Sequence, residues 1–241
     1  MDRWRFESSR GRIKYIMNID LKSYNGFAIV NSDSSSEALR LILYCGIHNI
    51  PILKLNKNEI CPNRYVPCGG VEWVEVILNT KPIPDYYPKW ATSILYRNIW
   101  KEDTWILGRK LFVKPADRYK RFTGFITYGT YAKKKKPPLI WSEIVSFDNE
   151  WRYYISNGKV LASGWYWGRH PDMENPPEPP DLDFIIPRDY SGALDLGIYN
   201  NKLTLVESQH PYACGWYGDH EEDHLYFQWL IDGWEYMNKG V

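Results

Sequence analysis

The sequence of 241 residues lacks the features that would place it in several large classes of protein. No stretch approaches the roughly 18 consecutive apolar residues that a membrane-spanning helix needs. Lysine and arginine number 30 against 29 aspartate and glutamate residues, a formal net charge of +1. The chain therefore has neither the basic excess of a protein that coats DNA nor an acidic tail. Its positively charged start, MDRWRFESSRGR, is followed by no apolar run and predicts no secretory signal.

Cysteine is scarce, and its spacing indicates no metal or redox site. The four cysteines are Cys45, Cys61, Cys68 and Cys214, and no two of them show C-x-x-C spacing. A chain of this length builds a core without disulfides. We therefore expect a reduced, soluble, cytoplasmic protein.

Aromatic side chains, in contrast, are abundant: 12 tryptophans, 19 tyrosines and 8 phenylalanines make up 16% of the chain. Hydrophobic residues of all kinds reach 44%, enough to fill a core, so the chain is not disordered. There is no internal repeat, and the length suits one large domain or two small ones.

The first third of the sequence predicts an α/β unit. Residues 27–30 form a short apolar run typical of a strand buried on both faces. Ser34 and Glu37 have the spacing of a capping box, and the apolar positions that follow continue at helical spacing until Gly46, where we expect the helix to end. Residues 50–53 predict the next strand. A strand, a helix and a strand with short links imply a parallel pair.

The middle of the chain changes from mixed to β-rich character. Residues 69–76 fit either a strand or the start of a helix. The three prolines of residues 81–89 predict a linker, and residues 91–100 predict one amphipathic helix. From about Trp105 onward strands dominate, over residues 111–113, 122–128 and 139–147.

Two hairpins and a final helix complete the predicted elements. Asn157-Gly158 is the strongest short-range hairpin signal, and a second turn is expected at Asn200-Asn201. Between them, PDMENPPEPPDLD predicts an acidic, proline-rich surface loop. Residues 226–238 predict a helix.

Three groups of polar residues in the second half are candidates for chemistry. Lys114 ends a strand and is followed by a basic loop that contains Gly124, an arrangement that can hold a polyphosphate. Glu143 and Glu150 come from neighbouring strands and could share a cleft. The turn at Asn200-Asn201 brings Asp195 near Glu207, and two carboxylates with an amide suit Mg²⁺. Taken singly, a solvated basic loop and exposed strand carboxylates explain each group equally simply.

Taken together, the order of these residues resembles the ATP-grasp family. The segments KPAD…KRFTG, SEIVSF…EWRYYI and DLGI…LVES look like a short ATP-grasp clade common in bacteriophages. The resemblance covers roughly residues 100–220. It implies an α+β, ATP-grasp catalytic domain over residues 101–241, in which two subdomains grip ATP. A pre-ATP-grasp-like α/β domain would precede it over residues 1–100.

The resemblance also implies a function and a set of site residues. It implies an ATP- and Mg²⁺-dependent ligase of the peptide type that joins a carboxylate to an amine through an acyl-phosphate. The substrates would be small molecules or peptides, and the location the cytoplasm (of the host, if the protein is phage-encoded). The implied nucleotide contacts are Lys114, Lys120, Arg121, Thr123, Gly124, Glu143, Ile144, Val145 and Glu150; the implied magnesium ligands are Asp195, Glu207 and Gln209; the implied catalytic residues are Arg152 and Lys120.

Two positions depart from the family pattern. Gln209 stands where the family usually has asparagine, which moves the amide oxygen one methylene outward. The family arginine two residues before the first metal carboxylate is replaced by Ala193. Arg152, a fixed bidentate donor, is the natural candidate for the transferred phosphoryl group or the acyl-phosphate.

Three alternatives remain open. His220 and His224 form an H-E-x-x-H motif, the spacing of a zinc hydrolase, although acidic residues at its middle positions favour a solvated helix start. The lysines of residues 133–136 could hold RNA, but the near-neutral total charge gives no strong nucleic-acid signal. A catalytically weak ATP-grasp protein that binds nucleotide or a host partner is the third.

Overall fold

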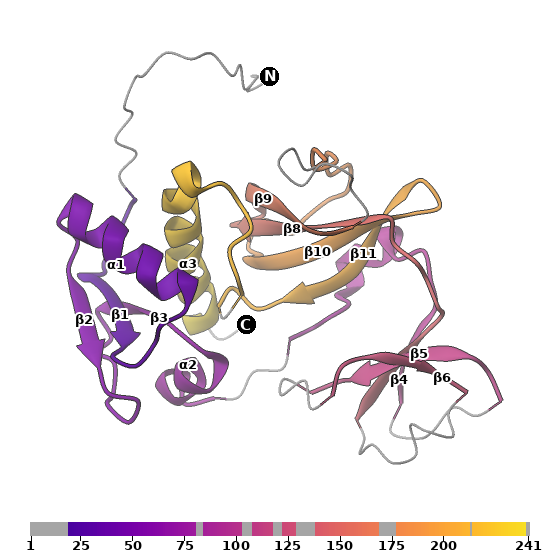
Figure 1. Cartoon of the computed structure of the whole chain (residues 1–241), viewed down its shortest axis with the longest axis horizontal. Helices are drawn as coiled ribbons and strands as arrows, with labels where there is room; N and C mark the ends of the chain where they lie inside the picture. The colour runs from indigo at the N-terminus through magenta and orange to yellow at the C-terminus, as the bar shows by residue number, and fades with distance from the viewer. Residues whose placement is uncertain are drawn as a thin grey trace.

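The computed structural model describes residues 19–80, 84–102, 108–117, 122–128, 138–168, 177–212 and 214–239. Within these ranges the chain forms one parallel and two antiparallel sheets together with three α-helices (Figure 1). This mixture confirms the expected α+β class. None of the helices in the described ranges is both long and apolar enough to cross a membrane.

The first unit is a parallel sheet with its helices. Its strand order is β2-β1-β3, and the predicted parallel pair is confirmed, because Phe27 of β1 lies opposite Ile52 of β2. The segment that fitted either a strand or a helix forms helix α2. The elements are β1 (Gly26–Val30), α1 (Ser36–His48), β2 (Ile52–Leu55), β3 (Tyr65–Cys68) and α2 (Val71–Leu78).

Both ends of α1 differ from the sequence prediction. The cap is Ser35 rather than Ser34, because the Ser35 hydroxyl oxygen accepts a hydrogen bond from the backbone N–H of Ala38 at 3.2 Å. The predicted end at Gly46 is wrong. The helix continues to His48, and Asn49 ends it in the left-handed conformation at φ 55°, where its backbone N–H bonds the carbonyl of Cys45.

The large sheet has the strand order β11-β10-β8-β9 and is antiparallel. Both predicted hairpins are confirmed, with positive φ at Asn157 (48°), Gly158 (73°), Asn200 (49°) and Asn201 (61°), as two-residue turns of this kind require. The strands are β8 (Asn149–Ser156), β9 (Lys159–Gly168), β10 (Gly192–Tyr199) and β11 (Lys202–Gln209).

The small sheet is antiparallel in the order β4-β7-β5-β6. The predicted helix over residues 91–100 is wrong: only a short 3-10 helix, η1, forms, in which Ala91 and Ile94 pack under the large sheet. Trp100 then lies opposite Trp141 in a strand pair. The elements are η1 (Lys89–Ile94), β4 (Ile99–Glu102), β5 (Leu111–Pro115), β6 (Phe125–Thr127) and β7 (Leu139–Ser142).

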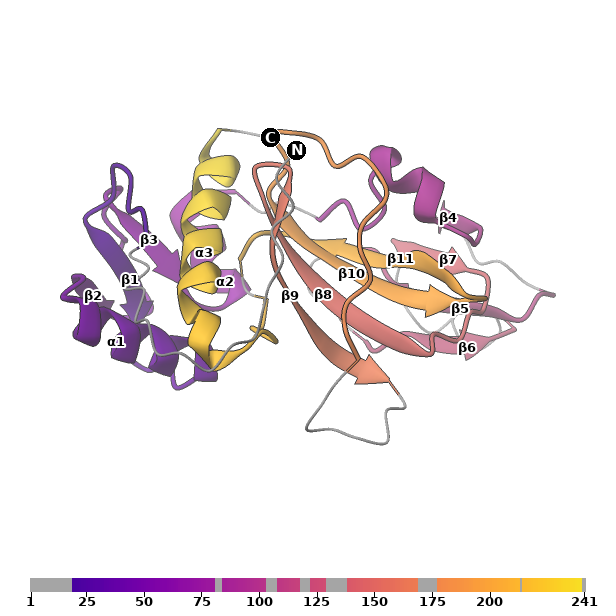
Figure 2. The same cartoon turned by 90° about the horizontal axis from the view of Figure 1, so that it is seen from above.

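Helix α3 (Asp223–Asn238) lies between the parallel sheet and the large sheet (Figures 1 and 2). It begins directly after the short 3-10 helix η3 (His220–Glu222). Phe227 packs against Phe27 of β1 with ring centroids 6.1 Å apart, while Trp229 packs edge-on against Tyr154 of β8 at 5.2 Å. The same helix therefore completes the cores of two sheets.

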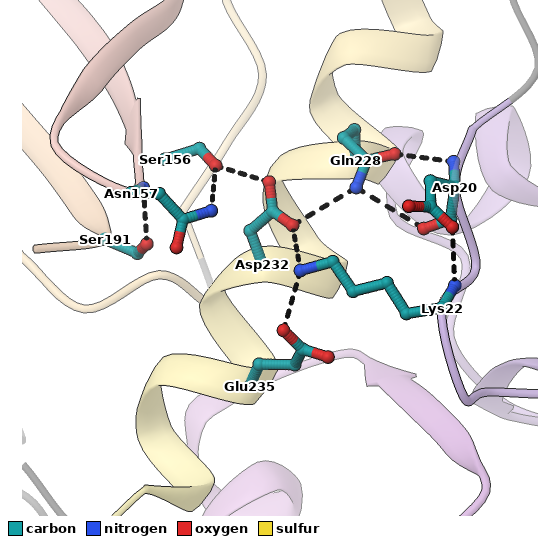
Figure 3. A network of polar contacts seen from close by, with 8 residues as sticks. All are labelled: Asp20, Lys22, Ser156, Asn157, Ser191, Gln228, Asp232 and Glu235. Atoms are coloured by element: carbon teal, nitrogen blue, oxygen red, sulfur yellow. Dashed lines mark hydrogen bonds and ion pairs between the residues drawn. The ribbon is translucent and has the colours of Figure 1, made fainter. Parts of the chain in front are cut away.

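A polar network accompanies this apolar contact (Figure 3). Asp232 of α3, 6% exposed, accepts hydrogen bonds from the hydroxyl of Ser156 and the amide of Gln228. Its carboxylate also lies 2.6 Å from the Lys22 ammonium, which contacts Glu235 at 2.6 Å. The network joins the segment before β1, helix α3 and the β8–β9 turn.

Candidate active site

The small sheet meets the large sheet through an ion pair between Lys114 of β5 and Glu207 of β11. The two groups lie 2.5 Å apart, and their side chains are 14% and 17% exposed. Because Val113 points into the small-sheet core, Lys114 points the other way, toward β11. Its ammonium also lies 4.6 and 4.9 Å from the ring centres of Tyr86 and Tyr87. Burial lowers the pKa of Lys114, but Tyr87 and Glu207 outweigh this effect and raise it, so the ammonium stays charged.

The acidic hairpin is arranged as its spacing predicted. Asp195 of β10 lies directly opposite Glu207 of β11, and the Gln209 amide donates a hydrogen bond to Glu207. Asp195 is 2% exposed. Arg152 of β8, its register partner on the other side, donates two parallel hydrogen bonds to it, at 2.7 and 2.8 Å. Such bidentate pairs are among the strongest hydrogen-bonded contacts in proteins.

Two tyrosines hold the Arg152 guanidinium in place. Its central carbon lies 5.6 Å from the ring centre of Tyr166 and 5.3 Å from that of Tyr217, and the two rings contact each other at 5.3 Å. Burial lowers the pKa of Arg152, but the hydrogen bonds to Asp195 raise it well above its usual value. Neither tyrosine was predicted to hold this arginine; the aromatic run around residue 166 was the available signal.

Glu150 adds a third carboxylate close to Asp195 and Glu207. It accepts a hydrogen bond from the Tyr166 hydroxyl at 2.5 Å. Burial is the main cause of its raised pKa; the hydrogen bond from Tyr166 lowers the pKa, and the charges of Asp195 and Glu207 raise it further. Glu150 therefore faces the acidic hairpin, and its predicted contact with ribose stays a prediction.

Glu143 follows β7 directly, at the edge of the small sheet, and is half-exposed. Its carboxylate accepts two hydrogen bonds from Asn98, one from the backbone and one from the side-chain amide, both at 3.0 Å. These bonds lower its pKa, with help from Arg109. Ile144 is exposed and Val145 half-buried. The predicted adenine-binding segment is therefore an accessible edge fixed by Asn98.

The predicted phosphate-binding loop is described only in part. Thr123 is exposed, and a Cβ added at Gly124 would lie 2.2 Å from the Phe112 ring, which explains why only glycine fits there. Lys120 and Arg121 lie outside the described residues, as do the four lysines of the proposed RNA-binding run.

Arg97 is a further residue of the site that was not predicted from the sequence. It is 9% exposed and donates hydrogen bonds to the carbonyls of Leu205 and Val206, at 2.6 and 2.9 Å. Its guanidinium also lies over the rings of Tyr87 and Phe147. It therefore fixes β11 immediately before Glu207. An arginine in an irregular segment gives no sequence signal for such a role.

The donor set fits a magnesium ion between phosphates and the hairpin. Asp195 and Glu207 supply carboxylate oxygens and Gln209 an amide oxygen, the ligands that this ion prefers. In the part of the chain that the structure describes, no three residues among histidine, cysteine, aspartate and glutamate gather as a metal cluster. The magnesium set therefore depends on Gln209.

The geometry does not favour the zinc alternative. The Arg40 guanidinium lies 3.3 Å from the His220 ring nitrogen and 3.1 Å from Asp223. His220 belongs to η3 and His224 to α3. A guanidinium beside one predicted ligand repels a second cation, and the described residues offer no three-residue cluster that would complete such a site.

The sheets and the acidic hairpin define a protein of the ATP-grasp class, a class that binds ATP. A family described as an ATP-grasp domain, the second family of its clade, matches residues 95–226. The chain belongs to this family, which confirms the resemblance seen in the sequence.

Solved structures are similar over most of the chain. A D-alanine–D-alanine ligase from Bacillus anthracis is 12% identical with a TM-score of 0.49, over 88% of this chain and 98% of that one. A RimK domain ATP-grasp protein from Sphaerobacter thermophilus is 8% identical with a TM-score of 0.46, over 86% and 98%. The ATP-grasp ligase PsnB, complexed with a minimal precursor, is 6% identical with a TM-score of 0.45, over 79% and 92%. No curated protein matches the sequence.

Proposed function

We propose that the protein is an ATP- and Mg²⁺-dependent ligase that joins a carboxylate to an amine through an acyl-phosphate. The observation that carries the proposal is the contact of Lys114 with Glu207. It brings a cation from the small sheet and a carboxylate from the large sheet to one point, where a nucleotide phosphate and its metal ion can replace each as the other's partner. The ATP-grasp family match supports the same function.

In the proposed reaction, an oxygen of the donor carboxylate forms a bond to the γ-phosphorus as the bond to ADP breaks. The amine nitrogen then bonds the acyl carbon, phosphate leaves with the electrons of the C–O bond, and the amine loses a proton. Bound magnesium would neutralise charge on the phosphates. Arg152 is held by Asp195 and two tyrosine rings, and orients the acyl-phosphate.

The remaining roles follow the family pattern and are part of the proposal. We also propose the domain division into residues 1–100 and 101–241. The bacteriophage association and the cytoplasmic location stay predictions from the sequence. The proposed phosphate contacts are Lys114, Lys120, Arg121, Thr123 and Gly124; the proposed adenosine contacts are Glu143, Ile144, Val145 and Glu150; the proposed magnesium ligands are Asp195, Glu207 and Gln209.

Thermal unfolding with and without Mg-ATP tests this proposal. A ligand at a hundred times its Kd stabilises the folded chain by about 2.7 kcal/mol, a readily measured rise in melting temperature. We expect Glu207→Ala to abolish the magnesium-dependent rise and Lys114→Ala to weaken ATP binding at least tenfold. His220→Ala, a matched control, should keep the full rise.

Two outcomes would change the assignment. If Lys114→Ala binds ATP as tightly as the unaltered protein, the phosphate site is wrong. If Mg-ATP binds but no ADP is released with any mixture of amino acids and peptides, the catalytically weak alternative replaces the ligase.

A further inference from the structure

A cavity of about 340 Å³ lies at one end of the parallel sheet, away from the Lys114–Glu207 pair. Its walls include Asp33, which follows β1, and Gly70, which follows β3. The chain crosses from β1 to β2 on one side and returns to β3 on the other. The carboxyl ends of β1 and β3 therefore form the switch point where open parallel sheets usually bind ligands.

The walls of the cavity carry two negative charges and no lysine or arginine. Glu37 accepts hydrogen bonds from the backbone N–H of Trp216 at 3.2 Å and from the Ser36 hydroxyl at 3.0 Å. Asp33 accepts one from the backbone N–H of Ser35 at 2.9 Å. Among the described residues, no salt bridge engages either carboxylate. A ligand complementary to this wall carries a positive charge.

The opposite wall has the opposite polarity. Gly70 is the N-cap of α2, and no side chain caps the first N–H groups of this helix. Gly70 and Val71 line the cavity, so these N–H groups and the positive end of the helix dipole can hold a carboxylate. The Cys68 thiol between the two walls adds no charge, because burial raises its pKa to about 12.

The acidic wall adjoins the proposed reaction centre. A Cβ added at Gly215 would lie 3.4 Å from the Glu37 carboxylate and 3.7 Å from the Tyr217 ring, and that ring lies 5.3 Å from the Arg152 guanidinium. The hydroxyl of Tyr154 fixes this segment, since it donates to the Gly215 carbonyl and accepts from the Tyr217 N–H. Glu37 is thus one ring away from Arg152.

We propose that this cavity binds the amine substrate as a free α-amino acid, with its ammonium at Glu37 and Asp33 and its carboxylate at the N-terminus of α2. The inference rests on the proposed ligase function. A volume at the lower end of the range of ligand pockets suits one amino acid. The ammonium passes one proton to the Glu37 carboxylate, and the neutral nitrogen then attacks the acyl carbon as described above. Its second proton leaves with the phosphate.

Binding of the 20 common L-amino acids, each measured by calorimetry, tests the proposal directly. At least one should bind, and both its amide, which lacks the carboxylate, and its N-acetyl derivative, which lacks the ammonium, should bind at least tenfold more weakly. Either derivative binding as tightly as the amino acid overturns the two-pole assignment.

Two variants test the two walls. Glu37→Gln keeps an acceptor for Trp216 but removes the charge, and should weaken amino-acid binding at least tenfold. Gly70→Asp places a carboxylate at the N-cap, where φ −66° and ψ 159° suit any residue and the nearest atom to the new Cβ is 3.8 Å away. It should abolish amino-acid binding without lowering the melting temperature. Glu59→Gln, an exposed carboxylate outside the cavity, is the control and should change nothing.

Mg-ATP binding separates the two proposals. Both cavity variants should keep the full rise in melting temperature with Mg-ATP. If Mg-ATP binds but no amino acid does, the cavity assignment is wrong and the ligase proposal stands. If an amino acid binds and Mg-ATP gives no rise, the ligase proposal is wrong and the amine role with it.

Discussion

The large sheet contacts its two neighbours in different ways. Toward the parallel sheet the contact is helix α3, with fully buried Phe227 and Trp229 and a buried carboxylate, Asp232. Toward the small sheet the described contacts are largely polar: the Lys114–Glu207 pair and the Arg97 hydrogen bonds. The first contact holds the fold together. The second is built from groups that a ligand can take over.

This difference follows from what each contact must do. Apolar burial of large side chains stabilises one arrangement over all others. An ion pair between a phosphate-binding cation and a metal-binding carboxylate neutralises both charges in the absence of ligand and can be exchanged for equivalent contacts with a nucleotide and its metal. The small sheet is therefore free to adjust to the ligand, while the parallel sheet is fixed.

The largest expected effect is at the α3 contact. Asp232→Ala removes the acceptor for Ser156, Gln228 and Lys22 and should lower the free energy of unfolding by about 2 kcal/mol. Glu235→Ala is the matched control, because it contacts the same ammonium from a more exposed position and should cost only about 0.5 kcal/mol. Urea unfolding measures both; equal losses would contradict the special importance of Asp232.

A smaller loss of stability is expected at the other contact. Arg97→Leu leaves the carbonyls of Leu205 and Val206 without their donors and should lower the free energy of unfolding by roughly 1–2 kcal/mol. Because Arg97 fixes β11 just before Glu207, Mg-ATP binding should weaken further than the loss of stability explains. Arg97→Lys, which cannot reach both carbonyls in the same way, should give an intermediate result. Unchanged nucleotide binding in Arg97→Leu would show that β11 does not need this support.

The smallest effect is a gain in stability that depends on pH. The pKa of Glu150 is raised by burial and by Asp195 and Glu207. A carboxyl with a raised pKa in the folded chain favours folding while protonated, and stability falls as the pH rises through that value. Glu150→Gln should therefore raise the melting temperature at about pH 7.5, and the gain should vanish below about pH 4. A gain that is constant with pH would contradict this origin.

Much of the fold could be predicted from local sequence signals. The turns at Asn157-Gly158 and Asn200-Asn201 need positive φ, which asparagine and glycine tolerate, so they determine the pairing of β8 with β9 and of β10 with β11. The second pairing by itself predicts that Asp195 lies opposite Glu207, as the structure confirms. Alternating or continuous apolar runs similarly identified β1 and β5.

The errors arose where tertiary contacts overrode local pattern. Residues 91–100 have helical spacing, but Ala91 and Ile94 satisfy the core under the large sheet in a single short turn, and Trp100 then pairs with β7. Helix α1 passes Gly46 because Asn49 provides the left-handed cap. In the site, Tyr86, Tyr217 and Arg97 were missed because only the folded chain brings them to Lys114, Arg152 and β11.

The position of α3 in the chain has a consequence for biosynthesis. Phe27 and Phe227, which contact each other, are 200 residues apart in sequence. During translation, the parallel sheet emerges from the ribosome long before the helix that covers it, and its apolar face stays exposed until then. The nascent chain is therefore most prone to aggregation just before α3 is made, and chaperone binding to the nascent chain should peak in that interval.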